Sequence, residues 1–249
     1  MRGWLNCIFI ASSGLSSLAA YSDHAHIAVA SNFALTMHRL ETVFEAETPH
    51  ELTTVFGSTG QLYAQILNKA PYHLFLAADQ KRPAQLLTNG SAVSGSQFTY
   101  ALGKLVLWTN EAAQESNLNL NSISGDYRHL AIANPLLAPY GIAAKETLLA
   151  LGQWNSLQSK IIFGQNVSQT YAMVSTRNAE IGLVALSNVV ARPENGTSVI
   201  IPKNYYSPIR QDVVVLKTGA SNPSAIEFIK FLQSPKAKDI IIEGGYELP

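Results

Sequence analysis

Short β-prone runs alternate with helix-like segments in the first third of the chain, and the links between them are only a few residues long. Strands are predicted at residues 26–30, 52–56 and 74–78, and helices begin near Phe33 and Gln61. Strands joined by such short links and intervening helices run parallel in one sheet. The sequence therefore predicts an α/β fold with a mostly parallel sheet flanked by helices.

A glycine turn, Gly57-Ser58-Thr59-Gly60, separates the second strand from the second helix. The two glycines permit a tight turn and a close approach by a ligand, and Ser58 and Thr59 are good N-caps. The unpaired N–H groups at a helix start carry partial positive charge, so this turn predicts an anion cradle. On this short motif alone, an ordinary capped helix without a ligand is the preferred interpretation, and the rest of the chain reverses that preference.

Polar or small residues follow each of the three strands at its carboxyl end. They are Ser31-Asn32, Ser58-Thr59 and Ala78-Asp79. Ligands of parallel α/β sheets bind beyond the carboxyl ends of the strands. We therefore expect these three pairs to converge on one site.

A second α/β pattern begins near residue 100. Strands are predicted at 104–108, 130–133, 160–163 and 180–186, and a helix is predicted at 142–151. The polar stretch between the first two of these strands is predicted to be a loop. The second pattern is similar in size to the first, which indicates two lobes.

The chain is expected to cross from one lobe to the other near residue 100 and to return near residue 205. The tail then adds a strand at 211–216 and helices at 223–232 and 235–243. We predict lobe I from residues 23–100 plus 206–249 and lobe II from residues 101–205. Two such lobes leave a cleft between them, a common place to enclose a small ligand.

The first residues form a separate segment, predicted to be a secretory signal peptide over residues 1–22. Arg2 precedes an apolar run that is rich in serine and alanine and ends in small residues. Cys7, the only cysteine of the chain, falls in this segment. A mature protein would therefore lack a thiol nucleophile, a zinc–cysteine site or an iron–sulfur cluster.

Composition and motifs exclude further classes of function. The 249 residues include 17 basic and 17 acidic side chains, a balance that argues against nucleic-acid binding. No apolar run reaches the roughly 18 to 20 residues of a membrane span. The six histidines have no metal-ligand spacing, and no Ser-His-Asp motif, catalytic carboxylate pair or phosphate-loop lysine emerges.

Several blocks, in order and at matching intervals from about residue 26 to 248, resemble the periplasmic molybdate-binding proteins of ABC importers. These blocks are Val29–Phe33, Gly57–Gly60 with Gln65-Ile66, Ala70–Asp79, Ala133–Pro135 with Pro139–Glu146, Gly152–Trp154, Asn166-Val167 and Ile181–Val184. The resemblance implies a two-lobed periplasmic binding protein fold (type II) whose interlobe cleft captures a tetrahedral dianion, molybdate or tungstate. The family's oxyanion contacts carry over onto Ser31, Asn32, Ser58, Thr59, the Ala78 backbone, Tyr140 and the N–H of Val167.

Two positions depart from the patterns of the family. One branch has a tyrosine ligand where this chain has Ala185, whereas another branch has it between Pro and Gly, as in Pro139-Tyr140-Gly141. We therefore expect Tyr140 to supply the one phenolic donor. His73 stands where many relatives carry aspartate, which leaves the role of that acid in this chain in question.

The resemblance also implies a partner and a location. It implies a monomer in the periplasm that delivers its ligand to an ABC permease, with no enzymatic activity and no cofactor. Serine, threonine, tyrosine, asparagine and backbone N–H groups all donate hydrogen bonds, and molybdate at neutral pH offers only acceptors. The alternatives are a receptor for sulfate or another tetrahedral oxyanion, and an exported enzyme or sensor domain on the same fold.

Overall fold

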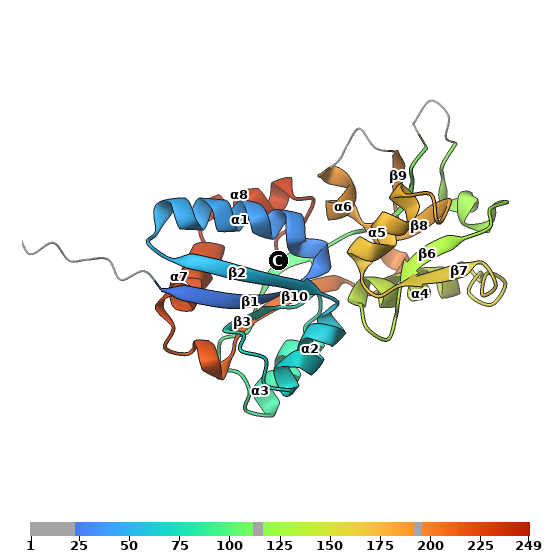
Figure 1. The fold of residues 1–249 in the computed structure, drawn as a ribbon. Helices are drawn as coiled ribbons and strands as arrows, with labels where there is room; N and C mark the ends of the chain where they lie inside the picture. Colours follow the sequence, from blue (N-terminus) through green and yellow to red (C-terminus); the bar gives the residue numbers. More distant parts are fainter. Residues whose placement is uncertain (1–22, 112–116, 192–195) are drawn as a thin grey trace, which may run out of the picture.

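Two α/β lobes form the molecule, and they lie side by side (Figure 1). The structure, a computed structural model, describes residues 23–111, 117–191 and 196–249. The predicted signal peptide lies outside these residues. Each lobe contains one sheet of five strands flanked by helices, so the predicted two-lobed α/β fold is confirmed.

Lobe I is built on a sheet with the strand order β2-β1-β3-β10-β4. As predicted, β1 pairs in parallel with β2 and β3, whereas β10 runs antiparallel between β3 and β4. The register places Ala30 beside Gly57 and Val29 beside Leu76, so the carboxyl ends of the parallel strands are level. The strands are β1 (His24–Ala30), β2 (Glu51–Gly57), β3 (Leu74–Leu76), β4 (Phe98–Gly103) and β10 (Ile209–Val215).

Helices cover both faces of this sheet. The helix that follows β1 places Met37, Leu40 and Phe44 in the core at helical spacing, and all three are fully buried. No helix among the described residues is long and apolar enough to cross a membrane. The helices of lobe I are η1 (Ser31–Phe33), α1 (Ala34–Glu47), α2 (Thr59–Leu67), α3 (Lys81–Thr88), η4 (Lys217–Gly219), α7 (Pro223–Leu232) and α8 (Pro235–Glu243).

Lobe II repeats this organisation with the strand order β7-β6-β8-β5-β9. In its sheet β6 is parallel to β7 and β8, whereas β5 is antiparallel to β8 and β9. The strands are β5 (Leu105–Thr109), β6 (Leu130–Ala133), β7 (Ile161–Gly164), β8 (Ile181–Ala185) and β9 (Thr197–Ile200). The helices are η2 (Leu120–Ser124), α4 (Pro139–Ala150), α5 (Val167–Ser175), α6 (Leu186–Val190) and η3 (Lys203–Tyr205).

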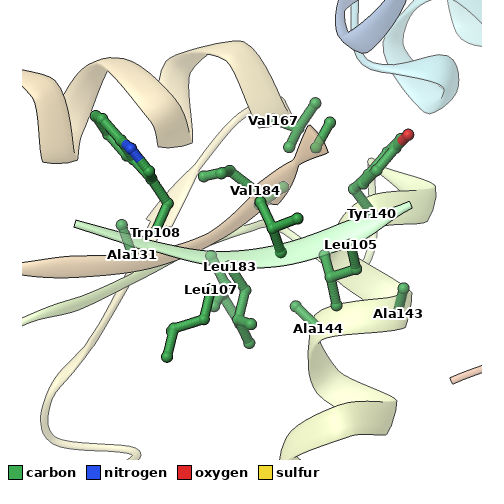
Figure 2. Packing of buried hydrophobic residues seen from close by; sticks show 14 of the residues in the cluster. Leu105, Leu107, Trp108, Ala131, Tyr140, Ala143, Ala144, Val167, Leu183 and Val184 are labelled. Atoms are coloured by element: carbon green, nitrogen blue, oxygen red, sulfur yellow. The ribbon is translucent and has the colours of Figure 1, made fainter. Parts of the chain in front are cut away.

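The core of lobe II extends to the junction of the two lobes. Trp108 stacks on Tyr171 inside it, with the ring centroids 4.3 Å apart, and Figure 2 shows the aliphatic side chains packed around the sheet. The same buried cluster includes Ala30 and Ala78, which come from the strand ends of lobe I. The lobes are therefore in apolar contact where the carboxyl ends of the lobe I strands meet lobe II.

The chain passes between the lobes at two points. It leaves lobe I at Lys104, between β4 and β5, and it returns between β9 and β10. The predicted boundary at residue 100 falls inside β4, which pairs with β10 in lobe I. The segment that follows Gly196 forms β9 and pairs with β5 in lobe II.

His73 occupies the turn before β3 and accepts a hydrogen bond. The backbone N–H of His26 donates to its Nδ1 atom over 2.8 Å, and its own N–H donates to the His26 carbonyl over 2.7 Å. The imidazole thus supplies an acceptor at the position where the family resemblance leads one to expect an acid. Burial lowers the pKa of His73, the positive charges that His26 and His24 can carry lower it further, and Asp23 opposes them.

This bond makes the stability of lobe I depend on pH. Protonation at Nδ1 removes the acceptor, and the pKa of His73 is lower in the folded chain than its ordinary value of about 6.5. The unfolded chain therefore binds more protons between these two pKa values, so stability falls as pH drops through that window. We expect urea unfolding of His73→Asn to show a weaker pH dependence than the wild type. An identical slope in both proteins would contradict this assignment.

Candidate functional site

The sequence-predicted residues of lobe I lie together at the carboxyl edge of its sheet. Ser31 and Asn32 form the short helix η1 after β1, and Ser58 and Thr59 stand at the start of α2 after β2. The backbone N–H of Ala78, beyond β3, donates to Oγ1 of Thr59 over 3.0 Å. All five residues are buried, so the three strand ends meet as the topology requires.

The start of α2 is fixed by a capping box. Oγ of Ser58 accepts from the N–H of Gln61 and donates to its Oε1 over 2.9 Å, while that Oε1 also accepts from the Ser58 N–H. These bonds hold the first turn in place. The glycine turn is thus a rigid helix start, with Thr59 held between α2 and the end of β3.

Asn32 is held by two partners in lobe I. Its Nδ2 donates to Oε1 of Gln211 over 2.7 Å and to the hydroxyl of Tyr246 over 3.1 Å. The Tyr246 hydroxyl in turn donates to the backbone carbonyl of Asn32 over 2.7 Å. A carboxamide nitrogen has two hydrogens, so both are engaged within the protein. The backbone N–H of Asn32, at a helix start, is the donor that this residue offers toward a ligand.

Lobe II brings Tyr140 and Val167 to the same junction. Tyr140 lies in the first turn of α4, where Pro139 begins the helix, and Val167 begins α5 after the N-cap Asn166. Figure 2 shows both at the edge of the apolar cluster, with the Tyr140 hydroxyl directed away from the aliphatic side chains. Ala185, where one branch of the family has its tyrosine, is buried at the end of β8. Tyr140 is thus the phenol that lobe II contributes from the start of α4.

The Tyr140 hydroxyl is buried beside lobe I without a hydrogen-bond partner of normal geometry among the described residues. A Cβ atom on Gly103 would lie 2.2 Å from this oxygen and 2.8 Å from Nε2 of Gln211. Burial raises the pKa of Tyr140 well above its usual range, and the phenols of Tyr246 and its neighbours raise it further, whereas the Gln211 amide lowers it. The phenol therefore keeps its proton at neutral pH and remains a donor.

Two hydroxyl groups of lobe II donate to the helix that carries the first pair of predicted contacts. Oγ of Ser168 donates to the Ser31 carbonyl over 2.8 Å, and Oγ of Ser187 donates to the Asn32 carbonyl over 2.9 Å. These bonds bind the carbonyl groups of η1 from the side of lobe II. They describe a closed arrangement of the two lobes.

A second set of contacts joins the lobes beside α2. The N–H of Gly60 donates to the Leu137 carbonyl over 2.8 Å. Arg82 forms an ion pair with Asp79 and also reaches the Leu136 carbonyl, 3.5 Å away. The arginine charge is therefore matched by a carboxylate beside this contact between the lobes.

The seven predicted contacts include no lysine, arginine or carboxylate. Within the described ranges, no group of three or more His, Cys, Asp or Glu side chains is arranged to hold a metal ion. Helix starts and neutral hydroxyl groups can stabilise an anion through oriented dipoles. Donors of this kind from both lobes are suited to a small ligand that presents only acceptors.

Sequence reasoning missed the residues behind these contacts. Gln211 and Tyr246 bond to Asn32, Tyr100 lies 3.3 Å from Oε1 of Gln211, and Gly103 abuts Tyr140. The sequence offered one signal for Gln211, which is that a glutamine stands at the start of the apolar run 211–216. A buried amide needs a hydrogen-bond partner, so a polar contact could have been expected there. We identify these residues from the structure alone.

Comparisons with known proteins agree with this architecture. Residues 25–247 match the family described as bacterial extracellular solute-binding protein. The molybdate-binding protein ModA of Azotobacter vinelandii is 41% identical over 238 residues, which are 95% of this chain and 94% of that protein. The ModA of Rhodobacter capsulatus is 41% identical over 92% of this chain and 90% of that protein. The structure of a periplasmic molybdate-binding protein from A. vinelandii superposes with a TM-score of 0.86 at 38% identity, covering 90% of this chain and 99% of that one.

Two lobes, each with one five-stranded sheet flanked by helices, and a chain that crosses twice between them form the architecture of the two-lobed solute-binding proteins. The match over nearly the whole described chain assigns the family. The chain belongs to the bacterial extracellular solute-binding proteins, among relatives that are named molybdate-binding proteins. The resemblance found in the sequence is confirmed.

Proposed function

We propose that this protein captures molybdate, and also tungstate, between its two lobes and delivers it to an ABC permease. The observation that carries this proposal is the buried hydroxyl of Tyr140, a neutral donor of lobe II that lies against Gly103 of lobe I without a hydrogen-bond partner of normal geometry among the described residues. The names of the two relatives that share 41% identity support the choice of anion. We assign Ser31, Asn32, Ser58, Thr59, Ala78, Tyr140 and Val167 to the site.

The chemistry of the ligand fits these donors. A fully deprotonated tetrahedral dianion accepts hydrogen bonds at every oxygen, whereas an oxyanion that retains a proton places that proton against a donor. Each charge-assisted hydrogen bond contributes about 1.5–3 kcal/mol, and several together reach sub-micromolar affinity after the cost of association. The proposed contacts are unreactive hydrogen-bond donors, which supports a receptor rather than an enzyme.

Isothermal titration calorimetry of residues 23–249 with molybdate, tungstate, sulfate and phosphate tests the proposal. We expect heat and tight binding with molybdate and tungstate, and weak or no binding with phosphate. Tight binding of sulfate with none of molybdate would replace the proposed ligand by the sulfate alternative. The absence of binding to all four anions would refute the oxyanion site.

Two single substitutions test the donors individually. Tyr140→Phe removes the phenolic donor of lobe II, and Thr59→Ala removes the hydroxyl that bonds to the Ala78 N–H in lobe I. We expect each to weaken molybdate binding about tenfold, since one lost donor costs about 1.4 kcal/mol. The dissociation constants come from the same titrations, with thermal melting as the control for folding. Unchanged affinity in both variants would contradict the site assignment.

We further propose that the protein acts as a periplasmic monomer whose lobes, residues 23–100 plus 206–249 and residues 101–205, move about the two crossovers. The interlobe bonds of Ser168 and Ser187 support a closed state that depends on single neutral hydrogen bonds. Such bonds contribute about 0.5–1.5 kcal/mol each. A permease that separates the lobes would therefore release the anion at modest cost.

A further inference from the structure

Gln211 lies at the centre of the junction although no sequence motif marks it. It is fully buried on β10, the strand that returns from lobe II, and the register with β4 shifts between Gln211 and Asp212, as it does at a β-bulge. Bulges occur next to functional sites, where they redirect a side chain. Its Nε2 atom is buried without a hydrogen-bond partner of normal geometry among the described residues. An unsatisfied buried amide costs about 1–3 kcal/mol, so its retention requires an explanation.

The orientation of the Gln211 amide follows from its neighbours. The Tyr246 hydroxyl donates its only hydrogen to the Asn32 carbonyl, so toward the Asn32 side chain it can only accept. The Asn32 group that faces Tyr246 is therefore the NH2, and its second hydrogen points to Gln211. The atom of Gln211 that meets this hydrogen must be the oxygen. The NH2 group of Gln211 is consequently turned the other way.

That NH2 group lies beside the orphan hydroxyl of lobe II. The hydroxyl oxygen of Tyr140 and Nε2 of Gln211 lie 2.2 Å and 2.8 Å from the position that a Cβ atom on Gly103 would occupy. An N–H group can only donate, so the phenolic oxygen must act as its acceptor. The phenolic hydrogen is then left to point away from Gln211. Nε2 of Gln211 and the hydroxyl oxygen of Tyr140, the two buried atoms without a partner of normal geometry, therefore suit each other as donor and acceptor.

We propose that Gln211 is a positioning residue of the oxyanion site, which holds the Tyr140 hydroxyl as an acceptor toward the protein and thus as a donor toward the anion. The inference rests on the proposed function and adds to it the direction of the hydrogen bonds that end at the Tyr140 hydroxyl. The Asn32 amide donates to both the Tyr246 hydroxyl and Oε1 of Gln211, and from Asn32 the donors then run one way, through Gln211 to Tyr140. This series of hydrogen bonds connects Asn32, a proposed ligand contact of lobe I, to Tyr140, a proposed contact of lobe II. Closure of the lobes therefore sets the direction in which the Tyr140 hydroxyl donates its hydrogen.

A double-mutant cycle between Gln211 and Tyr140 tests this inference by calorimetry with molybdate. We expect Gln211→Met to weaken binding about tenfold in the wild-type background, the effect of one donor. In the Tyr140→Phe background the same substitution should weaken binding less than about twofold, because the group through which it acts is gone. Equal losses in both backgrounds would mean a merely structural role and would overturn the inference. So would the absence of a loss in the wild-type background.

A second variant tests the direction of this series of hydrogen bonds. Gln211→Glu keeps the shape of the side chain and replaces the donor by an acceptor that competes for the phenolic hydrogen. We expect it to weaken binding more than Gln211→Met does. Affinity equal to that of the wild type would overturn the inference even if Gln211→Met fails to fold.

Gln97→Met is the matched control. Gln97 is also a part-buried amide near β10, and its Nε2 donates to Asp212 over 2.6 Å rather than to the site. We expect its affinity for molybdate to stay within about twofold of wild type. If the wild type binds none of the four oxyanions, the proposed function and this inference both fail. If it binds and the cycle shows no coupling, only the inference fails.

Discussion

In the variant Gly103→Ala we expect the affinity for molybdate to fall about 100-fold, or roughly 2.7 kcal/mol. The added Cβ would lie 2.2 Å from the Tyr140 hydroxyl oxygen and 3.0 Å from its ring carbon Cζ. Tyr140 is buried and its ring is rigid, so the clash must displace the phenol or push α4 away from lobe I. Either outcome removes the donor and opposes closure, a larger effect than loss of the hydroxyl alone.

Calorimetry measures this loss, and thermal melting shows whether the variant folds. Gly103 is not in a left-handed conformation, so alanine fits the backbone there and the effect should appear in binding rather than in stability. Combining Gly103→Ala with Tyr140→Leu, which has no hydroxyl to collide with, should give little further loss beyond Tyr140→Leu. A Gly103→Ala protein that binds molybdate like the wild type would show that the phenol does not have to lie against this glycine.

In the variant Gly141→Ala we expect the free energy of unfolding to fall by about 3 kcal/mol, at the upper end of the usual cost of overpacking. A Cβ there would lie 2.2 Å from the carbonyl oxygen of Ala133 and 2.8 Å from two backbone carbon atoms. These are backbone atoms at the end of β6, which cannot rotate away. The start of α4 would have to move away from the sheet, and Tyr140 would move with it.

Urea unfolding gives the stability change, and Gly152→Ala provides the comparison. Gly152 has a φ angle of +68° and no heavy atom within 4 Å of the added Cβ, so only its backbone conformation opposes alanine. That conformation costs about 1–2 kcal/mol for a residue with a Cβ. The loss in Gly141→Ala should therefore be the larger one, with reduced molybdate affinity as well. A smaller loss than in Gly152→Ala would contradict the packing argument.

Capping residues, prolines and apolar runs were sufficient to predict the helices and strands that are determined by a few neighbouring residues. The helices α7 and α8 begin and end at the predicted residues because each has a proline in its first turn and an Asn or Ser N-cap. The parallel strands β1 and β2 were predictable from their apolar runs and short links. The predicted convergence of their carboxyl ends followed from topology, since parallel strands in register end at one edge.

Elements stabilised by distant partners were missed. The strand β4 is only partly buried and pairs with β10, more than a hundred residues later, and with Glu247 near the end of the chain. The short helix α3 has only two buried residues, Pro83 and Leu86, too few to create a visible period. The helix α6 (residues 186–190) has five residues and follows β8 directly, so its first residue, Leu186, was assigned to the end of the predicted strand 180–186 and its remainder was missed.

The residues of the candidate site likewise fall into those with a local sequence signal and those that only distant partners bring into place. Ser58 and Thr59 are recognisable because a glycine turn and a helix cap are local, and Tyr140 and Val167 were placed by the family resemblance. Gln211 and Tyr246 were not predictable, because 179 and 214 residues separate them from Asn32. Their role depends on which atoms face each other, and that information exists only in the folded chain.

The near-balanced charge of the protein affects the rate at which an anion reaches it. Arg82 is paired with Asp79, the proposed contacts are uncharged, and residues 23–249, which lack Arg2, carry 16 basic and 17 acidic side chains. A net charge this close to zero supplies little long-range attraction for an anion, so we expect encounter at the pace of unsteered diffusion. Any discrimination among oxyanions must consequently arise in how long each one stays, which makes residence time the quantity that natural selection can tune in this protein.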